Sequence, residues 1–138
     1  MSARTLKLVV AYDGTAYQGW QRQANGPTIQ AALEDAFTPL AGQVPLVTGA
    51  GRTDAGVHAL AQVASVRLDI DHAVDVIRRA LNARLPPDIR VCAVTDMPAA
   101  FHARFDATGK TYRYRIVTAE VVSPFERWFV WDLPGRFD

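Results

Sequence analysis

The chain has 138 residues, 49% of them hydrophobic and 21% charged, which predicts one globular domain with a buried core and excludes a disordered chain. No apolar run approaches the ~20 residues that a membrane helix needs, and residues 1–7 lack the apolar core of a signal peptide. The single cysteine, Cys92, cannot form an internal disulfide, which favours a reducing cytoplasm, and its apolar neighbours predict a buried side chain.

The basic residues are more informative than the net charge of +1, which does not by itself indicate a nucleic-acid-binding protein. Two of the 15 basic residues are lysines, and the other 13 are arginines. Arginine suits contacts to phosphates and bases better than lysine does. A compositional bias of the source genome would give the same count, so both explanations stay open.

The first third of the chain predicts a strand, a helix and a second strand. Residues 6–12 are apolar and β-branched, as in a strand. Thr28 can cap a helix, which Pro39 and Gly42 are expected to end. Residues 44–47 predict a short strand that leads into a glycine-rich turn. The apolar face of the helix has helical spacing and consists of Ile29, Leu33, Phe37 and Leu40.

The middle of the chain repeats this order. Residues 60–68 alternate imperfectly between polar and apolar side chains, as in a well-buried strand. Asp71 is expected to cap a helix over residues 73–84, which Pro86 stops. A further strand is expected over residues 89–94.

The sequence of the last part of the chain predicts a loop and two further strands. A proline and the lack of periodicity predict a loop over 97–105, and a long strand is expected over 108–119. Residues 128–131 favour one more short strand. The order β-α-β-β-α-β plus an extra strand predicts a ferredoxin-like α+β fold, with an antiparallel sheet and both helices on one face. The other face of the sheet would then be open to a ligand or another domain.

Residues 51–58 hold an arginine, an aspartate and a histidine among glycines 49, 51 and 56. Glycine lets a backbone turn sharply or approach a ligand closely. A carboxylate in such a turn is a candidate nucleophile or base, and Arg52 would favour the ionised form of Asp54. By spacing alone, an ordinary polar turn is the simpler interpretation, with Asp54 capping a backbone group and Arg52 solvated. His58 is interpreted as a hydrogen-bonding support of the turn.

Two other segments combine aromatic with polar or basic side chains. Trp20, Arg22 and Gln23 lie in the loop after the first strand, and such side chains stack on bases and contact phosphates. A Trp20 packed in the core fits the pattern equally well. His102 and Arg104, between Phe101 and Phe105, are candidates for RNA contact, and both phenylalanines are also expected to anchor the loop. The chain has no CxxC, HExxH or phosphate-loop motif, so neither a structural metal nor a nucleotide cofactor is expected.

Five sequence blocks stand in a fixed order along nearly the whole chain, namely 12–23 (YDGTAYQGWQRQ), 50–58 (AGRTDAGVH), 81–91 (LNARLPPDIRV), 101–105 (FHARF) and 110–115 (KTYRYR). Block by block, they resemble the TruA family of tRNA pseudouridine synthases. The resemblance implies a cofactor-free isomerase that converts uridine to pseudouridine in the anticodon stem-loop of tRNA.

The resemblance also assigns roles to residues. It makes Asp54 the catalytic carboxylate, which attacks the sugar or base or takes a proton from the sugar. It makes Tyr112 the aromatic floor under the flipped uracil, whereas its pattern alone predicts a core tyrosine of an amphipathic strand. Arg52 would assist RNA binding or base extrusion, and Arg22 and Gln23 would contact RNA.

Family members are roughly twice this long, and their second domain supplies a basic residue that pairs with the catalytic aspartate. The resemblance therefore implies that residues 1–138 are a single N-terminal catalytic and RNA-binding domain, without the C-terminal domain. Such a chain alone is expected to be weak or inactive. The family works as a homodimer with tRNA spanning both subunits.

Two other functions fit the residues themselves. A non-catalytic RNA-binding module would use the tyrosines and arginines of residues 110–115 equally well. A carboxylate glycosidase normally needs a second acid across the bond, and no second acid lies near Asp54 in the sequence.

Overall fold

The computed structural model of the chain describes residues 3–106, 116–117 and 131–132. The chain divides into two compact units, Met1–Thr108 and Gly109–Asp138. In the second unit, β5 (Ile116–Val117) and β6 (Trp131–Asp132) pair in parallel. The strands predicted over 108–119 and 128–131 lie mostly outside the described residues.

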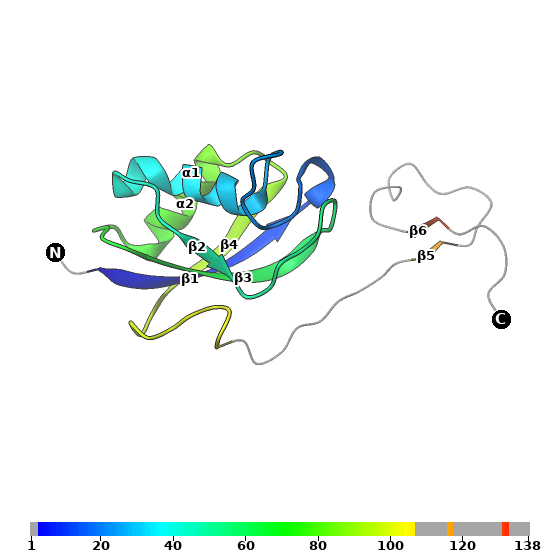
Figure 1. Ribbon diagram of the computed structural model, residues 1–138. Coiled ribbons are helices and arrows are strands. Elements are labelled where there is room, and N and C mark those ends of the chain that lie inside the picture. Colours follow the sequence, from blue (N-terminus) through cyan, green and yellow to red (C-terminus); the bar gives the residue numbers. More distant parts are fainter. Residues whose placement is uncertain (1–2, 107–115, 118–130, 133–138) are drawn as a thin grey trace. The chain divides into compact units, whose positions relative to one another are not determined.

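The first unit confirms the predicted ferredoxin-like order of elements. Its elements are β1 (Arg4–Tyr12), the 3-10 turn η1 (Gly14–Ala16), α1 (Ile29–Ala41), β2 (Val47–Gly49), β3 (Ala59–Leu68), α2 (Val74–Arg84) and β4 (Ile89–Met97). The sheet is antiparallel with the strand order β2-β3-β1-β4. Each helix therefore crosses over one intervening strand, and the two crossovers interlock as in a split β-α-β fold. Both helices cover the same face of the sheet (Figure 1).

The hydrophobic core lies between the helices and the sheet. Alternate residues of β1, namely Leu6, Leu8 and Val10, are fully buried, as the period of two in a strand requires. The helices add fully buried side chains at helical spacing: Ile29, Leu33, Phe37, Ile77 and Leu81. Because burying one such side chain stabilises a fold by ~1.5–3 kcal/mol, these residues hold the helices on the sheet.

The helix ends differ from prediction at two points. Thr28 caps α1 as predicted, since its hydroxyl accepts a hydrogen bond from the Ala31 amide at 3.2 Å. Pro39 does not end α1 but lies inside its last turn, and Gly42 ends the helix in a left-handed conformation, with φ 77°. Asp71 does not cap α2, which begins after Ala73 without a side-chain cap.

Strand β2 begins three residues later than predicted, at Val47. Gln30 and Glu34 of α1 bind the two backbone groups of Val47, at 2.8 and 2.9 Å. These bonds fix the start of the strand at Val47, while Val44 and Leu46, expected within it, are exposed. The later start of β2 therefore has a tertiary cause, which the local sequence does not contain.

The expectation that Cys92 is buried is wrong, because the side chain is exposed. In the register of β1 with β4, Val9 pairs with Ala93 and Val10 pairs with Val91. Cys92 is therefore the extra residue of a β-bulge in an edge strand, which turns its side chain away from the core.

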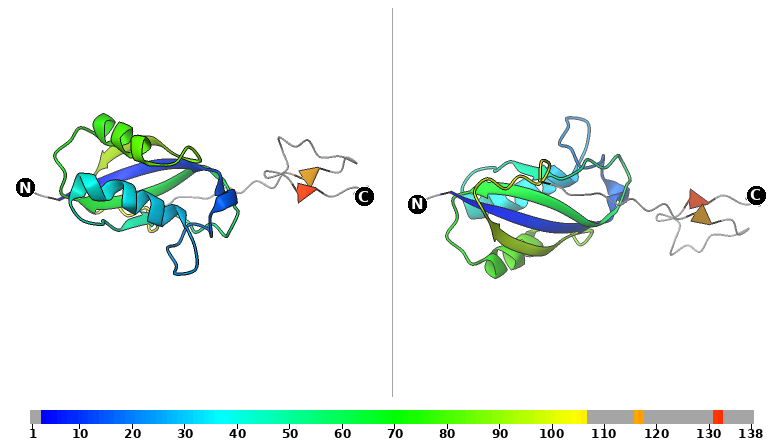
Figure 2. Two further views of the ribbon diagram at one scale, coloured as in Figure 1. Left: turned by 90° about the horizontal axis from the view of Figure 1, so that it is seen from above. Right: turned by 90° about the horizontal axis from the view of Figure 1, so that it is seen from below.

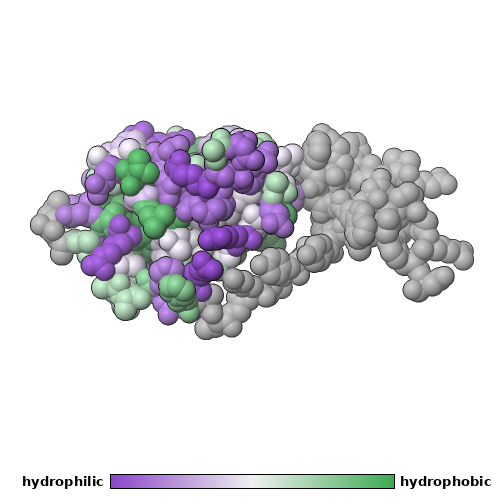
Figure 3. All heavy atoms as spheres, viewed as in Figure 1, coloured by the Kyte–Doolittle hydropathy of each residue, from purple (hydrophilic) through white to green (hydrophobic). Residues whose placement is uncertain are grey.

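The sheet face opposite the helices is partly covered by residues 98–106. This segment, which confirms the predicted loop, crosses beneath the sheet (Figures 1 and 2). The Ala103 amide donates a hydrogen bond to the buried Ser65 hydroxyl at 3.0 Å, and Thr5 donates to the Ala99 carbonyl at 3.5 Å. On the face that Figure 3 shows, hydrophilic residues predominate among the described residues, with hydrophobic residues between them.

Candidate active site

The glycine-rich turn forms the connection between β2 and β3, and Asp54 is exposed within it. The Asp54 carbonyl accepts a hydrogen bond from the Val57 amide at 3.1 Å, which closes a tight turn. Among the described residues, neither the Asp54 carboxylate nor the Arg52 guanidinium has a hydrogen-bonding or ionic partner. These two neighbours therefore form no ion pair with each other, and both side chains are available to a ligand.

The backbone around Asp54 is held by the loop that follows β1. The Trp20 amide donates to the Thr53 carbonyl at 3.0 Å, and the Gly56 amide donates to the Tyr17 carbonyl at 3.2 Å. Gly19 has φ 89°, and a Cβ there would lie 2.5 Å from the Thr53 carbonyl oxygen. Glycine is therefore required for this close approach, and the two loops form one connected structure.

Side chains complete these attachments. The Tyr12 and Thr53 hydroxyls lie 2.9 Å apart, and Gln62 of β3 donates to the Gly51 carbonyl at 2.6 Å. Trp20 is buried and packs against Tyr12, with ring centroids 6.3 Å apart. Of the two interpretations of Trp20, the structure therefore supports the core residue.

His58 supports the turn, as predicted. Its Nδ1 accepts a hydrogen bond from the Gly14 amide at 2.9 Å and lies 3.2 Å from Asp13 Oδ1. Partial burial would raise the pKa of Asp13, but the Thr15 hydroxyl and amide, together with His58, hold that pKa below its ordinary value. The Asp13 side chain is therefore ionised at neutral pH.

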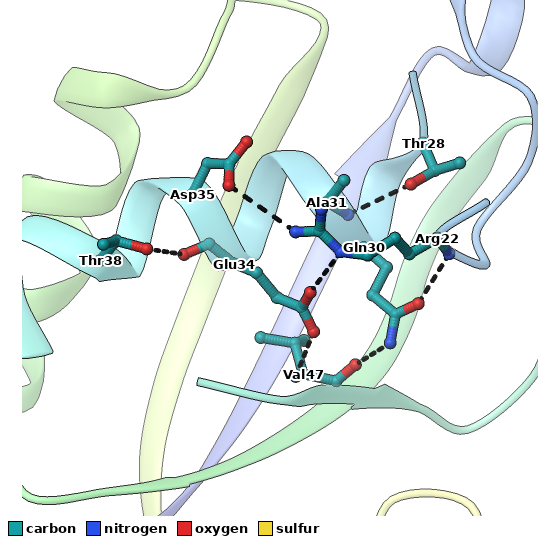
Figure 4. Close-up of polar contacts among 8 residues, drawn as sticks. All are labelled: Arg22, Thr28, Gln30, Ala31, Glu34, Asp35, Thr38 and Val47. Carbon is teal, nitrogen blue, oxygen red and sulfur yellow. Dashed lines mark hydrogen bonds and ion pairs between the residues drawn. The ribbon is translucent and has the colours of Figure 1, made fainter. Parts of the chain in front are cut away.

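Arg22 lies against acidic residues of α1 (Figure 4). Its Nε donates to the buried Glu34 carboxylate at 2.9 Å, and its guanidinium lies 3.6 Å from Asp35. Its backbone amide donates to Gln30, which also binds Val47. The Arg22 side chain is 47% exposed, so its outer side still faces solvent. The structure thus gives Arg22 a role in the fold, in addition to the predicted RNA contact.

The other predicted RNA-binding residues lie in two places. Gln23 is exposed, and its side chain donates to the Gln18 carbonyl at 2.7 Å. His102 and Arg104 belong to the segment across the outer sheet face, where the His102 ring stacks on the exposed Phe105 ring at 4.3 Å. Tyr112 lies outside the described residues.

The structure therefore connects Arg52 and Asp54 with the loop that bears Arg22 and Gln23, through the bond from Trp20 to Thr53. The segment of His102 and Arg104 is instead attached to β1 and β3. Sequence reasoning missed the contributions of Tyr12, Thr53 and Gln62 to the turn. The signal that could have found them was the position of Tyr12, which ends a strand on its buried face just before a glycine-containing turn.

Nothing in the described part of the chain groups three or more histidine, cysteine or acidic side chains as a metal site would. Over the same residues, no helix combines the length and the apolar character needed to cross a membrane.

Comparisons with known proteins identify the family of this chain. A profile of the tRNA pseudouridine synthase family matches residues 8–106. The curated tRNA pseudouridine synthase A of Geobacter sp. (strain M21) is 45% identical over 135 residues, which are 98% of this chain and 55% of the relative. The proteins of the same name from Solibacter usitatus and Akkermansia muciniphila are 46% and 47% identical, and the alignments cover 56% and 49% of their lengths.

The last two alignments cover 98% and 94% of this chain, and the chain spans about half the length of the curated relatives it matches. With a profile match over most of the chain and this degree of identity, the chain belongs to the tRNA pseudouridine synthase family.

Proposed function

We propose that this chain carries the catalytic carboxylate of a tRNA pseudouridine synthase whose substrate is a uridine in the anticodon stem-loop of tRNA. The observation that carries the proposal is the exposure of Asp54 on a hydrogen-bonded backbone. Its carboxylate is exposed and has no partner among the described residues. Trp20 and Gln62 donate hydrogen bonds to the backbone carbonyls of Thr53 and Gly51, and the hydroxyls of Tyr12 and Thr53 are hydrogen-bonded to each other. An exposed carboxylate on a hydrogen-bonded backbone suits attack on an external substrate.

The proposed reaction needs no cofactor to balance. The C1′–N1 glycosidic bond breaks, the uracil turns over and a C1′–C5 bond forms. The hydrogen on C5 leaves as a proton, and N1 takes up a proton from solvent, so no net change of atoms occurs. An ionised carboxylate serves this reaction as a nucleophile towards sugar or base, or as a base for a sugar proton. In either route Asp54 must reach the target nucleotide, which has to leave the RNA stack first.

The remaining predicted residues would bind the RNA. Arg52 is two residues before Asp54, where its planar guanidinium suits a phosphate or the extruded base. The proposal gives Tyr112 the place under the flipped uracil. The RNA backbone would contact residues on both sides of the sheet, namely Arg22, Gln23, His102 and Arg104.

We further propose that a second half, which the curated relatives have, completes the cleft and supplies a basic partner for Asp54. The charge of Asp54, unpaired among the described residues, supports that proposal. The whole protein would then act as a cytoplasmic homodimer that binds tRNA across both subunits, and the 138-residue chain alone would be weak or inactive.

The test measures tritium release from tRNA transcripts labelled at uridine C5, because joining through C5 expels that hydrogen. Two proteins are compared: the 138-residue chain, and the chain fused to the C-terminal half of the Geobacter relative, here called the extended protein. Asp54→Asn is made in both. Asp69→Asn is the matched control, because Asp69 is an exposed carboxylate just past the other end of β3.

We expect release by the extended protein, its loss in Asp54→Asn, and full activity in Asp69→Asn. Equal activity of the 138-residue chain would contradict the proposed role of the second half. If the extended protein binds tRNA without releasing tritium, and Asp54→Asn binds equally well, the chain is a non-catalytic RNA-binding module.

A further inference from the structure

We propose that Tyr12 is a positioning residue for Asp54, acting through the hydroxyl of Thr53. The inference rests on the proposed function, because it assigns Tyr12 a part in the reaction of Asp54. The Tyr12 and Thr53 hydroxyl oxygens are 2.9 Å apart, and Thr53 directly precedes Asp54 in the chain.

Tyr12 is well placed to serve as a fixed reference point. It is the last residue of β1 and only 4% exposed, and its ring packs against the buried Trp20. The pairing of β1 with β3 shifts between Val10 and Tyr12, so that Tyr12 faces Ala59 at the start of β3. A register shift next to an active site redirects side chains, and here the Tyr12 hydroxyl reaches Thr53 in the turn between β2 and β3.

Two groups of Thr53, its hydroxyl and its carbonyl, are hydrogen-bonded to residues outside the turn. Its hydroxyl meets Tyr12, and its carbonyl accepts the Trp20 amide at 3.0 Å. The turn around it contains Gly51 and Gly56, and glycines allow many backbone conformations. Two bonds at Thr53 therefore restrict the conformations from which Asp54 can reach a substrate.

The role predicts an effect on the chemical step more than on binding. Tyr12 is buried, whereas Asp54 and Arg52 are exposed. Tyr12 is therefore not expected to contact the RNA. A displacement of a catalytic group by about 1 Å can slow a reaction by about 100-fold. Loss of the Tyr12 hydroxyl should therefore lower kcat by about 10- to 100-fold and change KM for tRNA by less than about threefold.

The activity test uses Tyr12→Phe, Thr53→Val and the double variant in the extended protein. We expect each single variant to lower kcat, and the double variant to fall no further, because both remove one interaction. Thr53→Ser keeps the hydroxyl and should retain activity close to that of the wild type. The matched control is Tyr17→Phe, which removes a partly buried hydroxyl that donates to Asp88 at 2.8 Å rather than to the turn.

A second measurement does not depend on activity. Amide hydrogen exchange of residues 53–57 is followed in the 138-residue chain, and Tyr12→Phe should accelerate it by more than about threefold, whereas Tyr17→Phe should not. If the wild-type extended protein releases no tritium, the proposed function fails, and the exchange result alone decides the positioning role. Wild-type kcat in Tyr12→Phe, or exchange no faster than in Tyr17→Phe, overturns the proposal.

Discussion

At the scale of single residues, the charge of Arg22 compensates a buried carboxylate. Glu34 is buried and uses one oxygen for the Arg22 guanidinium and the other for the Val47 amide. A buried charge is tolerated when it is paired and hydrogen-bonded. Arg22 therefore contributes to the attachment of β2 to α1 as well as to the proposed RNA surface.

Replacement of Arg22 by alanine should lower the free energy of unfolding by about 1–3 kcal/mol, because it removes a hydrogen bond to a buried charged group. Urea denaturation of the 138-residue chain measures the change. The control is Arg67→Ala, since Arg67 is exposed on β3 and should contribute less than about 0.5 kcal/mol. Equal stability of the two variants would contradict the role assigned to the Arg22–Glu34 pair.

The environment of Tyr17 predicts that the free energy of unfolding depends on pH in the alkaline range. Burial and the hydrogen bond to Asp88 raise the pKa of its hydroxyl well above the ordinary value near 10. A raised pKa in the folded state contributes stability that is fully present below pH ~10 and is lost as the pH rises beyond it, because only the unfolded chain then ionises.

The free energy of unfolding of the wild type should therefore fall more steeply than that of Tyr17→Phe between pH ~9 and ~11.5. Urea denaturation at a series of pH values measures both slopes, and the values at pH ~7 give the cost of the lost hydroxyl. Parallel slopes would show that Tyr17 ionises as easily in the folded chain as in the unfolded one.

At the scale of elements, the turn between β2 and β3 depends on the close approach of the loop after β1. Gly19 carries two constraints, a positive φ and contact with the Thr53 carbonyl. Gly42 at the end of α1 has a similar φ of 77°, but a Cβ added there would meet no atom within 4 Å. Substitutions at these two glycines therefore distinguish the effect of backbone strain from the effect of contact with the turn.

Gly42→Ala should destabilise the chain by about 1–2 kcal/mol through its left-handed backbone alone and leave the activity of the extended protein unchanged. Gly19→Ala should cost more, because the added methyl group also displaces Thr53, and should lower tritium release at least about tenfold. Denaturation and kinetics on both variants test this. Equal effects would show that the contact with Thr53 does not matter.

The sequence predicted those elements whose causes are local. Thr28 begins α1 because a hydroxyl at that position caps a helix, and the apolar, β-branched residues 6–12 indicated strand β1. Bonds between distant residues set the start of β2 at Val47, and a bulge exposes Cys92, so neither followed from a local pattern. In the candidate site, the glycines marked the turn of Asp54, but its tie to β1 depends on the register of strands far apart in the sequence.

At the scale of the whole molecule, the hydrophobic core formed by the described residues belongs to the first unit. The buried residues of this core lie between Leu6 and Val94, and residues 98–106 cover part of the outer sheet face. A chain that ends at Thr108 therefore keeps these interactions, whereas one that ends at Met97 loses the bond from the Ala103 amide to the buried Ser65 hydroxyl.

We expect residues 1–108 to fold alone, with cooperative thermal unfolding within a few degrees of the 138-residue chain, because the deletion leaves this core intact. Residues 1–97 should lose about 1–3 kcal/mol, since Ser65 is left without the Ala103 amide and the outer face gains exposed surface. Circular dichroism during heating and urea denaturation compare the three lengths. If residues 1–108 failed to fold while the full chain did, the core would need residues 109–138, contrary to its place in the first unit. If residues 1–97 matched residues 1–108, the outer segment would be a passive cover, and the stability of the sheet would come from its helical face alone.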